Sequence, residues 1–423
     1  MGTFITKTSH RLLLLAILVS SMGEAKRATT RSQRQHDRRC AEALAKTLPK
    51  PNLKYWLRHL PPRGWSNRPW GDRSEIKAMT FNIYNVLTHA GRPEYVWDGQ
   101  KRKALPPRAI DPAKVRAKAG AILDVMPEVV MLQEIEGGAK AEEVLNQFAR
   151  EHLGGLYVAF VPRETNDPLG IKQGFLVRKD LMADYQFRIV SHVDRRYNAI
   201  DRFSAGSRHN IFTRDLPILL MTKKGDAEPF VAFANAHVKS RRPKLTESER
   251  KSQKPRAVVE AMARKRAERI AGYEVREMIK ILNKFYRDFP QTPYVLSGDF
   301  NRDIGSSEML RSLVTKANLR EGLAVNGRRL REQDKATAMY FRPGVGLEAD
   351  QSDGNFLSRH FSGHVIDSWV YRFRDPNHGS ELTIPESYAE RESEYPSDHF
   401  PVVVVLSTEA WPSVPTRQRR QSY

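Results

Sequence analysis

Hydrophobic residues along this chain gather into short runs, and several runs end abruptly in a polar side chain. The runs at 76–83, 129–134, 231–237, 294–301 and 402–406 have the length and composition of buried strands. The polar groups at their ends are of metal-binding or proton-transferring type: Asn82, Glu134, His237, Asp299, Asn301, Asp398 and His399. Because charged groups beside buried strands are costly unless they are paired or bound to metal, this repetition predicts a shared functional site.

Helical periodicity appears between these strands. Apolar residues recur with helical spacing at 113–125, at 139–153 and from Arg256 towards Lys284. Shorter apolar runs at 156–161, 174–177, 187–193 and 216–222 predict further strands. Strands that alternate with helices in this way favour an α/β-layered domain.

The stretch Gly298-Asp299-Phe300-Asn301 follows one of the apolar runs directly. Side chains two residues apart in a strand point to the same face, so the Asp299 carboxylate and the Asn301 amide are expected to emerge together. Two interpretations stay open for this stretch alone. It is either an Asx turn that closes a strand or part of a functional site at a strand end.

Six short motifs in this order resemble those of the endonuclease/exonuclease/phosphatase superfamily. They are Phe81-Asn82, Gln133-Glu134, Asn235-Ala236-His237, Gly298-Asp299-Phe300-Asn301, Ile366-Asp367 and Ser397-Asp398-His399. The resemblance covers roughly residues 76–406. It implies a four-layer αββα sandwich, an α/β fold in which two packed sheets lie between outer helices.

The resemblance further implies a magnesium-dependent phosphodiesterase, with Mn²⁺ or Ca²⁺ as alternative ions. Glu134 would bind the metal, and Asn82 and Asp398 would support the metal site. A hard divalent cation prefers carboxylate oxygen and offsets the charge of a phosphate diester. We therefore expect a metal centre at these three residues.

Five residues would carry out the proton transfers and stabilise the phosphate. By the resemblance, Asp299 would orient or deprotonate the attacking water, and Asn301 would donate hydrogen bonds to the phosphorus centre. His399 would contact the phosphate with its ring held by Asp367. His237 would be the second imidazole and a candidate acid for the leaving oxygen.

The chain departs from the family pattern at two positions. Abasic-site endonucleases carry an Asp two residues after the first Asn of the motif set, whereas this chain has Tyr84 there. Deoxyribonuclease I pairs its first His with a Glu, and the rough equivalent here is near Gln173. The partner of His237 therefore stays open.

The formal net charge is +21, which favours polyanionic partners. Positive charge is concentrated at 239–269, which holds twelve Lys or Arg against four Glu. This segment is either a solvated helix face or a contact surface for polyanions. In the second interpretation, the predicted substrate contacts are Arg264, Lys265, Arg266 and Arg269.

The remaining chain divides by composition. Residues 1–25 have the positive start, short apolar run and small residues of a secretory signal, which predicts a secreted or periplasmic protein. Residues 26–75 form a basic, Pro- and Trp-rich extension, and 76–408 form the predicted domain, with 239–285 as a basic helical insertion. Residues 409–423 are a basic tail. No later stretch is apolar enough to cross a membrane.

The sequence therefore predicts a secreted, metal-dependent phosphodiesterase, with a nuclease acting on nucleic acid as the preferred interpretation. One alternative keeps the chemistry but changes the substrate to a phospholipid headgroup or a phosphomonoester. Another is a polyanion-binding protein on an inactive enzyme scaffold. The oligomeric state and the choice between DNA and RNA are not predicted.

Overall fold

The computed structural model describes residues 75–84, 95–97, 102–104, 111–168, 170–198, 208–241, 245–325, 330–342, 346–375 and 379–408. The predicted signal segment, the extension up to residue 74 and the tail at 409–423 lie outside the described residues. Among the described residues, no helix has the length and apolar character needed to span a bilayer.

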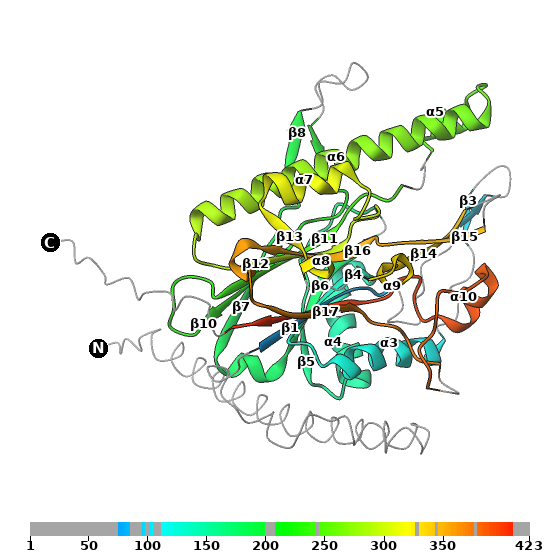
Figure 1. Cartoon of the computed structure of the whole chain (residues 1–423). Helices are drawn as coiled ribbons and strands as arrows, with labels where there is room; N and C mark the ends of the chain where they lie inside the picture. Colours follow the sequence, from blue (N-terminus) through cyan, green and yellow to red (C-terminus); the bar gives the residue numbers. More distant parts are fainter. Residues whose placement is uncertain are drawn as a thin grey trace, which may run out of the picture.

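Two six-stranded sheets form the centre of the molecule (Figure 1). The first sheet has the order β17-β18-β1-β4-β6-β5, and the second has the order β13-β16-β12-β11-β10-β7. The strands of the first sheet are β1 (Glu75–Asn82), β4 (Val129–Ile135), β5 (Tyr157–Phe160), β6 (Lys172–Arg178), β17 (Val365–Val370) and β18 (Val402–Ser407). Those of the second are β7 (Tyr185–Val190), β10 (Ile218–Lys223), β11 (Val231–His237), β12 (Tyr294–Asp299), β13 (Leu319–Glu321) and β16 (Asp353–Ser358).

Three apolar clusters define the layers. One lies between the sheets and includes Val129, Phe233 and Val404. A second joins the outer face of the first sheet to α3 (Pro112–Val125) and α4 (Ala141–His152). A third joins the outer face of the second sheet to α6 (Arg256–Asp288) and α7 (Glu308–Lys316). The predicted four-layer αββα sandwich is confirmed.

Each sheet contains one parallel strand pair among otherwise antiparallel neighbours. β1 pairs in parallel with β4, and β11 pairs in parallel with β12. The connection from β1 to β4 includes α3, and the connection from β11 to β12 includes α6. Helical crossovers of this kind are what parallel neighbours require. The carboxyl ends of each parallel pair therefore lie at the same edge of their sheet, and these ends carry Asn82, Glu134, His237 and Asp299.

Buried amides tie the two sheets together close to these strand ends. Gln133 Nε2 donates to Asn235 Oδ1 over 2.7 Å, and Asn235 Nδ2 donates to the backbone oxygens of Leu132 and Gly174, both over 2.9 Å. Buried polar groups of this kind are stable only when they are hydrogen-bonded, so the contacts fix the relative position of the sheets.

The other described elements lie outside the two sheets. They include the hairpins β2 (Tyr95–Trp97) with β3 (Arg102–Ala104), β8 (Arg196–Asn198) with β9 (Arg208–Asn210), and β14 (Ala338–Arg342) with β15 (Gly346–Asp350). Short helices are α5 (Glu247–Arg250), α8 (Gly322–Val325), α9 (Glu332–Lys335) and α10 (Tyr388–Glu394). The helix predicted from Arg256 is confirmed as α6, a single 33-residue helix.

Candidate active site

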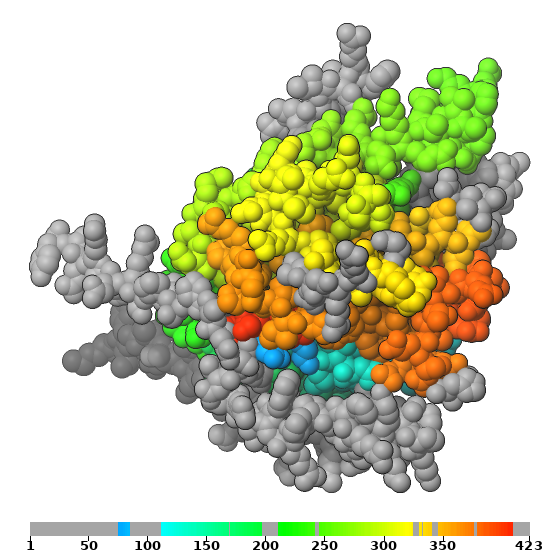
Figure 2. Space-filling model, in the orientation of Figure 1, coloured from blue at the N-terminus to red at the C-terminus, as the bar shows by residue number. Residues whose placement is uncertain are grey.

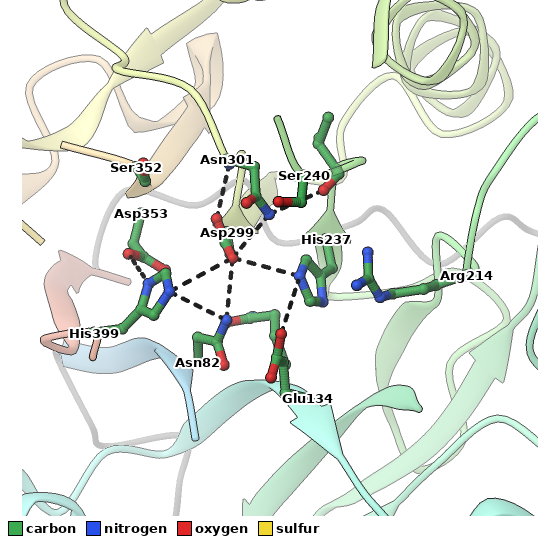
Figure 3. A network of polar contacts seen from close by, with 12 residues as sticks. Asn82, Glu134, Arg214, His237, Ser240, Asp299, Asn301, Ser352, Asp353 and His399 are labelled. Atoms are coloured by element: carbon green, nitrogen blue, oxygen red, sulfur yellow. Dashed lines mark hydrogen bonds and ion pairs between the residues drawn. The ribbon is translucent and has the colours of Figure 1, made fainter. Parts of the chain in front are cut away.

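Left-handed backbone conformations occur at three residues of the shared strand edge. Tyr84, Glu134 and Asn301 have φ angles of 49°, 60° and 52°. For residues other than glycine this region is uncommon and costs free energy, and such residues cluster at functional sites. At Glu134 the conformation coincides with a shift in the pairing of β4 with β6, between Leu132 and Ile135. This irregularity directs the Glu134 side chain towards the second sheet (Figure 3).

Asp299 lies at the centre of the site's polar contacts (Figure 3). Its Oδ2 accepts hydrogen bonds from Asn82 Nδ2 over 3.1 Å and from Asn301 Nδ2 over 3.0 Å. Its Oδ1 accepts the backbone N–H of Asn301 over 2.7 Å. Oδ2 also lies 3.4 Å from His237 Nε2. One carboxylate thus joins β1 of the first sheet to β11 and β12 of the second.

The environment of Asp299 raises the proton affinity of its carboxylate. Burial raises the pKa of this carboxyl from 3.8 to about 7; the charge of His399 opposes the shift, and Asp353 and Glu134 add to it. A carboxyl group with a pKa near neutrality can both take and release a proton, which suits a general base.

Asp353 holds the ring of His399. Its Oδ2 lies 2.7 Å from His399 Nδ1, and the Asp353 side chain is fully buried. The β12–β16 register places Asp353 opposite Asp299. The prediction that Asp367 holds this ring is wrong, because Asp367 lies in β17 of the other sheet, where its carboxylate accepts the backbone N–H of Ser368.

Three carboxylates surround His399 and stabilise its charged form. Burial lowers the pKa of this imidazole, but Asp353, Asp299 and Asp398 together raise it well above 6.5. Nε2, the nitrogen that does not face Asp353, lies 3.9 Å from Asp299 Oδ2. His399 is therefore an oriented imidazolium that can donate a hydrogen bond or a proton.

His237 faces a carboxylate from each of the two sheets. Its Nε2 is 3.4 Å from Asp299 Oδ2 and 3.8 Å from Glu134 Oε1. Gln173 instead donates from Nε2 to the backbone oxygen of Asp215 over 2.8 Å. Arg214 extends beside His237 (Figure 3) and brings a positive charge to the same edge.

The donor chemistry at the first sheet's edge fits a hard divalent cation. Asp398 Oδ1 is buried without a hydrogen-bond partner among the described residues, and Glu134 is partly exposed. Burial is the larger cause of the raised pKa of the Tyr84 hydroxyl, and both carboxylates raise it further. Asn82 turns its amide nitrogen to Asp299, while its oxygen accepts the backbone N–H of Tyr84 over 3.1 Å. Carboxylate oxygens are the ligands that Mg²⁺ prefers.

A second set of potential metal ligands overlaps the first. Asp299, Asp353 and His399 each offer a ligand atom, and these atoms lie within 4.8 Å of one another. The Nδ1 atom of His399 is already hydrogen-bonded to Asp353. The mixed nitrogen and oxygen donors of this cluster suit Mg²⁺ less well than the carboxylates of Glu134 and Asp398.

Sequence reasoning missed Lys118, whose side chain is fully buried at this edge. Its Nζ donates to the backbone oxygen of Ile83 over 2.6 Å, which fixes the turn after Asn82. Burial lowers the pKa of this ammonium to about 7, although Asp398, Glu136 and Glu134 act in the opposite direction. Lys118 therefore stabilises both the end of β1 and the nearby carboxylates.

The four predicted substrate contacts on α6 do not share one role. Arg264, Lys265 and Arg269 are exposed, whereas Arg266 is half-buried and binds both carboxylate oxygens of Glu249 in α5. We therefore correct the prediction for Arg266, whose guanidinium is used to join two helices. The other three stay candidates for contact with a polyanion.

No family model matches the chain, and no curated protein matches it. Solved structures do match. An endonuclease/exonuclease/phosphatase family protein from Bacteroides thetaiotaomicron is 15% identical with a TM-score of 0.46, over 80% of this chain and 97% of that one. TDP2 from Caenorhabditis elegans is 15% identical with a TM-score of 0.42, over 79% and 75%. The human Nocturnin catalytic domain with bound sulfate is 14% identical with a TM-score of 0.46, over 79% and 95%.

The geometry brings together the residues that the ordered motifs single out. The residues predicted from the motifs meet at one edge of a two-sheet sandwich, with Asp353 in place of Asp367 (Figure 3). This arrangement is the one that the resemblance to the endonuclease/exonuclease/phosphatase superfamily implies, apart from the residue that holds His399.

Proposed function

We propose that this protein is a metal-dependent phosphodiesterase that hydrolyses nucleic acid. The observation that supports this most is the polar cluster around Asp299, which accepts hydrogen bonds from Asn82 and Asn301 and has two imidazole nitrogens within 3.9 Å of its Oδ2. A base, an oriented acid and amide donors are the groups that in-line attack of water on a phosphodiester requires.

Each side chain has a task in this proposal. Asp299 takes a proton from the attacking water, and Asn301 orients the Asp299 carboxylate by donating to its Oδ2. His399, fixed by Asp353, donates to a phosphate oxygen. His237 is placed to protonate the leaving oxygen. Their hydrogen bonds preorganise these groups before substrate binds.

Glu134 and Asp398, with Asn82 beside them, would hold the metal ion. A bound divalent cation offsets phosphate charge and polarises the phosphorus centre. Mg²⁺ is the proposed ion because the available donors are oxygens, and Mn²⁺ is the alternative that accepts the same ligands.

Nucleic acid is proposed over a phospholipid because of charge. The chain carries a formal net charge of +21, and Arg264, Lys265 and Arg269 are exposed on α6. A polyanion gains from every such contact, whereas a single headgroup gains from few. The signal-like sequence at 1–25 supports export as the setting of this activity.

The substrate class can be tested directly. Purified protein is incubated with plasmid DNA, RNA, sphingomyelin and a small chromogenic phosphodiester, with and without EDTA. We expect EDTA-sensitive cleavage of nucleic acid and of the small diester. Cleavage of sphingomyelin alone would favour the lipid enzyme, and DNA binding without hydrolysis of any substrate would favour the inactive scaffold.

A further inference from the structure

The first half of α6 and the preceding α5 form a projection that we name the basic arm (residues 246–269). It extends past the end of the sandwich and is seen as the light-green projection at the upper right of Figures 1 and 2. Thr246 and Glu249 cap α5 by reciprocal hydrogen bonds, and Arg266 binds Glu249 to hold α5 against α6. The arm therefore consists of two helices held together by an ion pair.

The acidic residues of the basic arm are all used in ion pairs. Three of its cations pair with three of its acids, as Lys251–Glu247, Arg256–Glu260 and Arg266–Glu249, and the fourth acid, Glu268, pairs with Arg302 outside the arm. The arm holds eight Lys or Arg against four Glu, a formal charge of +4. Its four acids are therefore paired, and Arg264, Lys265 and Arg269 are exposed.

A chain of contacts joins the basic arm to the strand edge that carries Asp299. Glu268 Oε2 accepts from Arg302 Nε over 3.0 Å, and Arg302 is almost fully buried. The Arg302 guanidinium donates to the backbone oxygens of Asn301, over 2.6 Å, and Lys239, over 3.2 Å. Arg302 therefore links Glu268 of the arm to the backbone of Asn301, two residues after Asp299.

A second carboxylate of α6 anchors the helix at the same edge. Glu274 is buried, and its oxygens accept the backbone N–H groups of Thr213 and Lys239, both over 2.7 Å. Thr213 precedes Arg214, and Lys239 follows His237 by two residues. With Glu268 and Glu274 both fixed to the site, the direction in which α6 leaves it is fixed as well.

The position of Glu268 defines how far the basic arm extends from the site. Arg264 and Lys265 lie about one helical turn from Glu268, and Arg256 lies twelve residues from it, or about 18 Å along the axis at 1.5 Å per residue. Successive nucleotides of a duplex strand are about 3.4 Å apart along the axis, so the arm spans about five base pairs.

We propose that the basic arm binds the nucleic-acid backbone on one side of the cleaved phosphate and makes activity depend on about five base pairs of flanking duplex. This inference rests on the proposed nuclease function and specifies its substrate as an extended polymer. Contacts to phosphates carry no base information, so the dependence is one of length and salt rather than sequence.

The side chains of the arm favour nucleic acid over a membrane surface. The buried positions Val259, Ala263 and Ala267 turn the apolar stripe of the helix towards the protein. The large exposed apolar side chains of the arm are Val258 and Met262, about half exposed. A helix that lies in a membrane interface needs a broad apolar face, which this one does not offer.

The test compares two variants of equal charge change. The arm variant is Arg264→Gln, Lys265→Gln, Arg269→Gln; the control is Lys280→Gln, Lys284→Gln, Arg287→Gln, at exposed positions on the last turns of the same helix. Binding to labelled duplexes of 6, 12 and 24 base pairs is titrated against salt in EDTA, so that metal-dependent hydrolysis does not interfere. Because the arm variant would neutralise three fewer phosphates than wild type, the slope of log affinity against log salt should flatten by about two to three units on the longer duplexes.

Hydrolysis with Mg²⁺ is then measured on the same duplexes and on a dinucleotide. The wild-type ratio of kcat/KM between 24-base-pair duplex and dinucleotide should fall in the arm variant and persist in the control. Equal salt slopes for wild type and arm variant, or equal losses in the control, would overturn the inference. The inference would also be overturned if the arm variant lost binding to phosphatidylserine vesicles while its salt slopes on DNA equalled those of wild type. If no substrate is hydrolysed while the DNA slopes behave as expected, the proposed enzymatic function fails and the arm's polyanion contact stands.

Discussion

Replacing Asp353 by Asn should slow the proposed hydrolysis without unfolding the protein. The substitution keeps the shape of the side chain but removes the charge that lies 2.7 Å from His399 Nδ1. A hydrogen bond to a charged group contributes about 1.5–3 kcal/mol, which corresponds to a loss of about 10- to 150-fold in rate if the contact persists into the transition state. Because the Asn amide can present its N–H₂ group to the ring, the preferred ring orientation is weakened as well.

The matched control is Asp367→Asn, which removes the carboxylate that the motif order alone would assign to His399. Asp367 lies in β17 and accepts the backbone N–H of Ser368, so we expect a change in rate of less than about threefold, since its carboxylate is bonded locally. The assay is kcat and kcat/KM on the small chromogenic phosphodiester, with thermal melting to confirm folding. A folded Asp353→Asn protein of normal activity, or an inactive Asp367→Asn protein, would refute the assignment.

Three further predictions concern the same edge of the sandwich. His237→Ala and His399→Ala should each reduce kcat by about 100-fold or more, and the double variant should lose less than the product of the single losses because both act in one step; a fully multiplicative loss would show that they act independently. Gly298→Ala should lower the free energy of unfolding by about 1–3 kcal/mol or more in urea titrations, because the added Cβ would lie 1.9 Å from the Ala236 oxygen; unchanged stability would show that the strands can separate here. Lys118→Met should remove a pH dependence of stability. The folded pKa of Lys118, about 7, lies below its ordinary 10.5, so the unfolded state binds more protons between these values and wild-type stability rises with pH. The slope should reach at most about 1.4 kcal/mol per pH unit, and the same slope in the variant would contradict the assignment.

The long periodic segments could be predicted from sequence because their signal is local. The apolar runs that end in Asn82 and His237 predicted the ends of β1 and β11, the run ending in Glu134 predicted β4 to within one residue, and the helix predicted from Arg256 towards Lys284 is α6 (Arg256–Asp288). The four-layer arrangement depended on the resemblance, since periodicity does not say how two sheets pack.

Asp353 could not be found in the same way. It begins β16, whose sequence Asp353-Gly354-Asn355 has the composition of a turn. The strand forms through pairing with β12, far away in sequence, and its polar side chains are buried through contacts such as Ser297 Oγ with Asn355. Only tertiary structure shows that this Asp, rather than Asp367, faces His399.

Lys118 and Arg266 lie on helices, and their burial also could not be predicted from sequence. Both occupy positions where a charged residue predicts solvent exposure. Lys118 is fully buried because its ammonium reaches the Ile83 oxygen, and Arg266 is half-buried because it binds Glu249. Charge on a helix therefore identifies candidate contacts, and partners elsewhere in the fold decide which cations remain available.

The most direct test of the central claim is a Mg²⁺ titration of hydrolysis by wild-type protein and by Glu134→Gln, on the small phosphodiester. The account predicts saturable activation of the wild type, complete loss in excess EDTA, and a variant that melts like wild type but turns over several orders of magnitude more slowly. Full wild-type activity in excess EDTA, or a Glu134→Gln protein that responds normally to Mg²⁺, would contradict it.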